Sequence, residues 1–190
     1  MIEKKQTQVI QNKVSMDGLL QRRSGIEHYA SIISKVWKVD ISTDVAFQKE
    51  FTYFFRVRRN ENWRNVFYKL FEECKSVKEL SFEKVLREIY RLTGRIEASF
   101  SSKLVATLNP EMPIWDSIVL SKLQMKAPIG KDKELRLEKT IKLYADIVGW
   151  YSTFMKTDNA KKWIAEFDKT FPEFVGITEV KKIDFMLWGN

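Results

Sequence analysis

Apolar side chains in this 190-residue chain recur at steps of three and four, the spacing that places them on one face of an α-helix. The chain holds only 7 glycines and 4 prolines, and they fall where the helical patterns end. No segment shows a strand pattern of comparable strength. The sequence therefore predicts an all-α fold: a single globular domain of about eight packed helices over residues 14–190.

Residues that start and end helices divide this pattern into segments. Ser24 forms a capping box with Glu27, Ser81 is a predicted N-cap, and Gly94 a predicted helix end. The first two helices begin at Ser24 and near Thr43 or Asp44. A third follows directly, and others begin at Ser81, at Trp115 or Asp116, near 132 (running to 156), at Asp158 or Asn159, and at Thr178.

The apolar faces of these helices supply the predicted core. The first face comprises Ile26, Tyr29, Ala30, Ile33, Val36 and Trp37. The second carries Val45, Phe47, Phe51, Phe54 and Phe55, and the third carries Trp63, Val66, Phe67, Leu70, Phe71 and Cys74. Because Cys74 lies on such a face, it is expected to be a small buried residue rather than a nucleophile.

Composition narrows the possible functions. Cys74 is the only cysteine and His28 the only histidine, which excludes an internal disulfide and a His/Cys zinc site. No apolar run is long enough to span a bilayer, and the N-terminus shows no secretory signal. We therefore expect a cytoplasmic protein without metal or cofactor, whose polar residues 1–13 form a disordered tail.

The net charge of +8 is the main indication of a partner. A positive field attracts polyanions and raises their encounter rate, which favours nucleic acid. Many proteins of this size are basic without such a partner, so charge alone leaves both interpretations open. A Gly-rich phosphate loop, a nucleophile elbow and a Ser/His/Asp set are all absent from the sequence.

The segment Ser99–Asp116 places a lysine on a short amphipathic helix, then a proline-bounded turn, then an aspartate at the head of the next helix. This resembles the core of the helix-hairpin-helix DNA glycosylases. The resemblance implies that Lys103 is a nucleophile that forms a Schiff base with the sugar of a flipped nucleotide. It also implies that Asp116 stabilises the positively charged transition state.

The match departs from that family at two points. Ser99-Phe100-Ser101-Ser102 replaces the Gly-rich hairpin, so Ser101 and Ser102 take the place of its phosphate-binding residues. Only 116 − 103 = 13 positions separate Lys103 from Asp116, fewer than is usual in the family. An alternative stays open, in which Asp116 is an ordinary N-cap and Lys103 lies on a solvated helix face.

A second resemblance spans most of the chain. It rests on residues 55–60, 94–100, 113–116 and 181–188, which read FRVRRN, GRIEASF, PIWD and KKIDFMLW. These segments are similar to those of a family of bacterial all-helical proteins of unassigned function. The resemblance implies a fold but no activity.

One basic segment combines arginines with aromatic residues. Tyr53, Phe54 and Phe55 precede its arginines and Trp63 follows them. Such aromatics either offer a stacking platform for bases or belong to the core, and their helical spacing favours the core. The arginines predicted to contact nucleic acid are Arg56, Arg58, Arg59 and Arg64.

Two hypotheses about function follow. In the first, the chain binds DNA and excises a base with Lys103 and Asp116. In the second, it is a non-enzymatic binding or assembly module without nucleic-acid chemistry, and the segment from Ser99 to Asp116 is only a packed turn.

Overall fold

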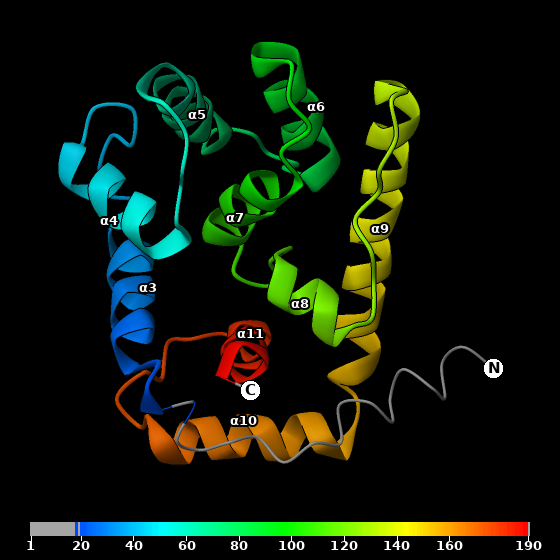
Figure 1. Cartoon of the computed structure of the whole chain (residues 1–190). Coiled ribbons are helices and arrows are strands. Elements are labelled where there is room, and N and C mark those ends of the chain that lie inside the picture. Colours follow the sequence, from blue (N-terminus) through cyan, green and yellow to red (C-terminus); the bar gives the residue numbers. More distant parts are fainter. Residues whose placement is uncertain (1–17, 19, 190) are drawn as a thin grey trace. The chain divides into compact units, whose positions relative to one another are not determined.

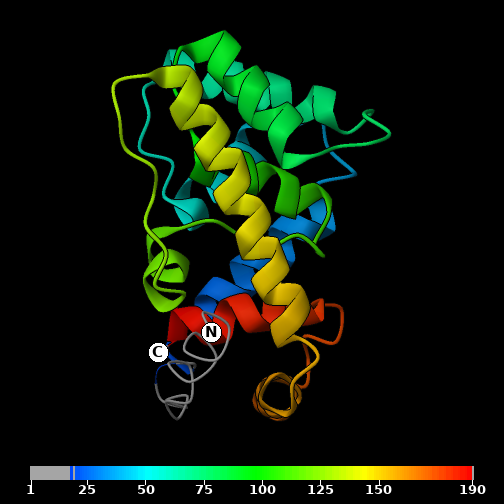
Figure 2. The same cartoon turned by 90° about the vertical axis from the view of Figure 1, so that its right-hand side faces the viewer.

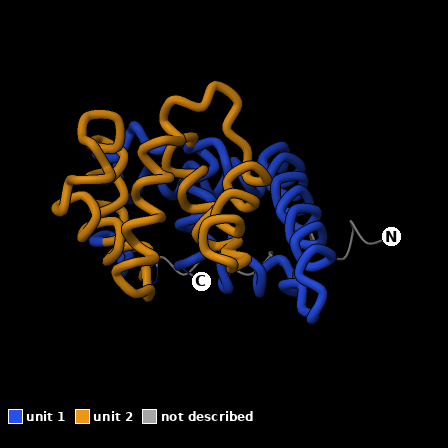
Figure 3. The backbone as a smooth tube through the Cα atoms, turned by 90° about the horizontal axis from the view of Figure 1, so that it is seen from above, with its two compact units in different colours: residues 1–24, 110–190 blue, residues 25–109 orange. Residues whose placement is uncertain are grey.

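The computed structural model describes residue 18 and residues 20–189 (Figure 1). These residues form nine α-helices and no strand, which confirms the predicted all-α domain. Its contacts cluster into two compact units, residues 25–109 and residues 1–24 with 110–190 (Figure 3). The expected tail, residues 1–13, lies outside the described residues, so the predicted domain bounds stay a prediction.

The unit of residues 25–109 contains five helices. They are α3 (Arg23–Lys35), α4 (Val45–Phe55), α5 (Glu61–Cys74), α6 (Phe82–Thr93) and α7 (Ala98–Leu108). Asp44, Asn60 and Ser81 each accept a hydrogen bond from the backbone N–H three residues further on, which starts α4, α5 and α6. Gly94 ends α6 with a φ of 69°, a conformation that glycine adopts without strain.

Aromatic residues spaced four apart fill the core of this unit. Phe47, Phe51 and Phe55 lie along one face of α4, and all three are buried. The Phe51 ring lies 4.5 Å from that of Phe55 and 5.3 Å from that of Phe71 on α5, measured between centroids. Most of the predicted faces of α4 and α5 therefore pack as core, and Cys74 is buried with them as predicted. Two expected core residues do not: Val45 is 59% exposed and Tyr53 is 69% exposed.

The other unit contains α8 (Ser117–Lys122), α9 (Lys133–Phe154), α10 (Asp158–Thr170) and α11 (Glu179–Gly189). Every residue from 180 to 187 is buried, so α11 is a central helix of this unit. It packs against α8 and α10, and both views show α10 beside it (Figures 1 and 2).

Polar contacts from α11, from the residue before it and from α9 hold the turn at residues 110–113. The Lys181 ammonium donates to the Met112 carbonyl oxygen at 2.6 Å, and the Thr178 hydroxyl donates to that of Pro110 at 2.8 Å. The Tyr144 hydroxyl on α9 donates to the Pro113 carbonyl oxygen at 2.8 Å. These bonds satisfy backbone carbonyls that a buried turn would otherwise leave unpaired.

Three further expectations for helix ends and faces were wrong. Helix α3 begins at Arg23, so Ser24 lies inside its first turn and is not the N-cap. The helix ends at Lys35, which leaves Trp37 beyond the helical register and 59% exposed. Thr157, rather than Asp158 or Asn159, caps α10 through its hydroxyl.

The described residues contain neither a membrane-spanning helix nor a cluster of metal ligands. None of the nine helices is both long and apolar enough to cross a membrane. Residues 18 and 20–189 contain no group of three or more His, Cys, Asp or Glu side chains placed to hold a metal ion.

Candidate functional site

Lys103 lies on α7 in the unit of residues 25–109, and its ammonium group has several contacts. It donates to the Phe55 carbonyl oxygen at 3.2 Å. It also lies 5.7 Å from the ring centroid of Phe55 and 5.4 Å from that of Phe100. The Lys103 amino group thus has a carbonyl oxygen and two aromatic rings as neighbours, and its role as a nucleophile stays a prediction.

Asp116 lies in the other unit, where it is the N-cap of α8. Its carboxylate accepts a hydrogen bond of 2.8 Å from the backbone N–H of Val119. This is the ordinary capping geometry of an aspartate. Because Lys103 and Asp116 belong to different units, each is placed only within its own unit, and their joint catalytic role stays a prediction.

Ser101 and Ser102 lie in the first turns of α7, and both are buried. The Ser101 hydroxyl donates to the Glu97 carbonyl oxygen and the Ser102 hydroxyl to that of Ser99, each at 3.0 Å. The segment that replaces the Gly-rich hairpin is therefore continuous helix. The predicted role of the two serines with phosphate stays a prediction.

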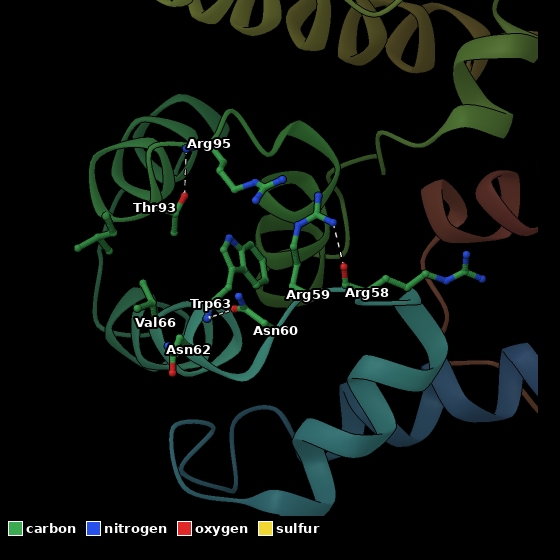
Figure 4. Close-up of a pocket in the computed structure, with 9 residues that line it drawn as sticks. Arg58, Arg59, Asn60, Asn62, Trp63, Val66, Thr93 and Arg95 are labelled. Atoms are coloured by element: carbon green, nitrogen blue, oxygen red, sulfur yellow. Dashed lines mark hydrogen bonds between the residues drawn. The ribbon is translucent and has the colours of Figure 1, made fainter.

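Two of the four predicted arginines, Arg58 and Arg59, line a pocket of about 460 Å³ in the unit of residues 25–109 (Figure 4). The connection between α4 and α5, the start of α5 and the end of α6 form its walls. The lining residues are Arg58, Arg59, Asn60, Asn62, Trp63, Val66, Leu92, Thr93 and Arg95. We call it the arginine pocket.

Arg59 is held rigidly in the wall of the arginine pocket. Its Nε and Nη2 donate to the two carboxylate oxygens of Glu97, at 2.8 Å and 2.9 Å. Its guanidinium lies 5.9 Å from the Trp63 ring centroid and 5.2 Å from that of Phe100. The hydrogen bonds with Glu97 raise the pKa of Arg59 above its ordinary value, so this arginine is a permanent, fixed cation.

Arg95 is the second cation that faces the arginine pocket, and sequence reasoning missed it. Its side chain is 62% exposed, and its Nε lies 3.4 Å from a Glu97 oxygen. In Figure 4 its guanidinium turns towards the pocket, whereas the side chain of Arg58 extends away from it. The sequence feature that could have located Arg95 is the helix end at Gly94, because the chain turns there and brings Arg95 back beside the start of α5.

The other two predicted arginines do not line the pocket. Arg56 is exposed, and it ends α4 with a φ of 52°, in the left-handed region. Arg64 lies one turn into α5, and its Nη1 donates to the Arg59 carbonyl oxygen at 3.1 Å. Arg64 thus supports the backbone that carries Arg59.

Comparisons with known proteins add no further information about this site. No family model, no curated protein and no solved structure matches the chain. The local resemblance to the glycosylases therefore has no support beyond the residues that carry it.

Proposed function

We propose that this chain binds nucleic acid and that the arginine pocket receives a backbone phosphate. The observation that carries the proposal is the placement of two arginines, Arg59 and Arg95, around one pocket with a single carboxylate, Glu97, between them. Two guanidinium groups and one carboxylate leave a net positive charge there. Guanidinium groups suit phosphate because their planar donors match its oxygens.

The charge of the whole chain supports a polyanionic partner over a small anion. The net charge is +8, and the isoelectric point is about 9.4. The positive field of the whole chain attracts the many phosphates of a nucleic acid at once. A small anion would need only the local charge of the pocket.

Binding is tested with a charge-matched pair of variants. Arg95→Gln removes an exposed cation of the arginine pocket, and Lys161→Gln removes one from α10. Both side chains are mostly exposed, and each lies near one acidic partner, Glu97 or Asp158. We expect Arg95→Gln to weaken binding of a fluorescent oligonucleotide about tenfold by losing a charged hydrogen bond, and Lys161→Gln to weaken it less than about twofold. Equal losses would contradict a phosphate site at this pocket.

Base excision by Lys103 and Asp116 is the enzymatic form of this proposal, and the local resemblance to the glycosylases is its support. A lysine nucleophile forms an imine with abasic-site DNA, which borohydride reduces to a stable covalent complex. Trapping that disappears in Lys103→Ala would support the role. Absence of trapping, or trapping unchanged in Lys103→Ala, would exclude it while leaving DNA binding intact.

A non-enzymatic binding module is the second candidate. The contacts of the two predicted catalytic residues favour it, because the Lys103 amino group donates to the Phe55 carbonyl oxygen and lies over the Phe100 ring, and Asp116 caps α8. If the chain is such a module, replacing Lys103 or Asp116 affects stability and no catalytic activity. This candidate fails if Lys103→Ala or Asp116→Asn abolishes a turnover at unchanged melting temperature.

A further inference from the structure

The indole nitrogen of Trp63 is a buried donor without a hydrogen-bond acceptor in the structure. The side chain is only 7% exposed. Its ring stacks on Phe67, with centroids 5.1 Å apart and planes 13° apart, so the indole cannot turn freely. A buried N–H without an acceptor is unfavourable, and such groups in native proteins call for a specific explanation.

This donor belongs to the arginine pocket, which Trp63 lines. In Figure 4 the indole nitrogen lies on the edge of the ring that faces Thr93 and Arg95. The Thr93 hydroxyl donates to the Ile89 carbonyl oxygen at 2.7 Å and accepts from the Arg95 backbone N–H at 3.3 Å, but it makes no hydrogen bond with the indole nitrogen. A guanidinium group has no acceptor, so the side chains of Arg59 and Arg95 cannot accept the indole hydrogen bond.

We infer that the arginine pocket binds a phosphate group through a direct hydrogen bond from the Trp63 indole N–H to a phosphate oxygen. Arg95, exposed and held only by a 3.4 Å contact with Glu97, turns to pair with the charge of the same phosphate. The inference rests on the proposed function, and it names the Trp63 indole N–H as the donor that contacts the phosphate. Arg59 stays bound to Glu97 and contributes its fixed charge.

The apolar part of the arginine pocket suits a nucleoside attached to the bound phosphate. Val66 and Leu92 form an apolar part of its wall, next to the polar part formed by Trp63 and the arginines. Its volume of about 460 Å³ lies in the range of pockets that hold small organic ligands and exceeds what a phosphate alone needs. A nucleoside attached to the bound phosphate therefore has room against Val66 and Leu92.

Two kinds of phosphate in a nucleic acid have oxygens that could accept this hydrogen bond. A phosphodiester inside the strand has two non-bridging oxygens, and a phosphomonoester at the strand end has three and more negative charge. Both accept the indole hydrogen bond, so the test compares them directly.

The test follows the indole N–H signals of the ¹⁵N-labelled full chain by NMR. The chain has 6 tryptophans, and the Trp63 signal is identified as the one that Trp63→Phe removes. The probes are inorganic phosphate and two oligonucleotides of one sequence, with a 5′-phosphate or a 5′-hydroxyl end. We expect a saturable downfield shift of the Trp63 signal, and little change at Trp37, which is 59% exposed.

The two oligonucleotides distinguish the source of the phosphate. A shift only with the 5′-phosphate identifies a strand end, and equal shifts with both identify an internal phosphodiester. An unshifted Trp63 signal while the oligonucleotides bind would overturn the inference and leave the proposed function standing. If neither oligonucleotide binds at all, both fail.

Affinity provides a second readout. Trp63→Phe keeps an aromatic ring against Phe67 and removes only the donor and part of the ring. We expect it to weaken oligonucleotide binding about tenfold, the effect of losing one hydrogen bond to a charged acceptor. Trp37→Phe is the control and should change the affinity less than about twofold. A folded Trp63→Phe protein with unchanged affinity would contradict the assigned hydrogen bond.

Discussion

Lys181 and Asp184 lie one turn apart on α11 and form an ion pair of 2.7 Å with only 1% of each side chain exposed. The Tyr151 hydroxyl donates to the other oxygen of the Asp184 carboxylate. Burial lowers the pKa of Lys181 and raises that of Asp184, while each charge favours the ionised form of the other. The two side chains depend on their mutual contact, and Lys181 also donates to the Met112 carbonyl oxygen.

Removing one partner of this pair should be strongly destabilising. Asp184→Ala leaves the Lys181 ammonium buried without its counter-ion and the Tyr151 hydroxyl without its acceptor. We expect the free energy of unfolding to fall by about 3–5 kcal/mol, measured by urea denaturation. The exposed pair of Lys161 and Asp158 provides the control, since Lys161→Ala should change stability by no more than about 0.5 kcal/mol.

Replacing both charges together should cost less than replacing one. The double variant Lys181→Met/Asp184→Leu removes the buried charges and leaves apolar side chains of similar size. Its free energy of unfolding should exceed that of Asp184→Ala. If the double variant is the less stable of the two, the hydrogen bonds to Tyr151 and Met112 matter more than the charges.

Cys74 should be unreactive until the protein unfolds. Burial raises the pKa of its thiol from 9.0 to about 11, so the reactive thiolate is scarce at pH 8. We expect a thiol reagent to modify Cys74 only after denaturation. Rapid modification of the folded protein at pH 8 would contradict this burial.

The raised pKa of the Cys74 thiol also makes the stability of the protein depend on pH. Above pH 9 the unfolded chain loses the thiol proton while the folded chain keeps it, so the folded state binds more protons. The stability associated with Cys74 is therefore fully present below pH 9 and is lost as the pH rises through about 11. Cys74→Ala should show a flatter decline over this range in thermal denaturation at several pH values.

Two variants of Asp116 distinguish the effect of its capping hydrogen bond from the effect of its negative charge. Asp116→Ala removes the acceptor for the Val119 N–H and should lower stability by about 1 kcal/mol. Asn caps helices about as well as Asp, so Asp116→Asn should be near neutral for stability while removing the charge. Asp132, the N-cap of α9, is the matched position, and its Ala and Asn variants should show the same order. Similar losses for Asp116→Ala and Asp116→Asn would show that the charge of Asp116 matters beyond capping.

The sequence predicted most helices because their signals are local. The N-caps at Asp44 and Ser81 and the helix end at Gly94 act within one turn, and the structure confirms all three. The exposure of Trp37 was missed because it depends on where α3 stops. Periodicity specifies a helix face better than a helix end.

The arginine pocket was only half predictable. Arg58 and Arg59 were found because they stand together in the sequence, whereas Arg95 approaches them only through the fold. Glu97, which binds both Arg59 and Arg95, was missed for the same reason. The buried pair on α11 was missed because two charged residues on a helix are usually exposed, and only tertiary packing buries them.

The salt dependence of oligonucleotide binding tests the central claim most directly. Each phosphate contact adds about 0.7–0.9 to the slope of the logarithm of the binding constant against the logarithm of salt concentration. We expect a steep negative slope for the native chain, and a slope smaller by about one contact for Arg95→Gln but not for Lys161→Gln. A flat titration of the native chain would contradict nucleic-acid binding, and an unchanged slope in Arg95→Gln would contradict a phosphate at the arginine pocket.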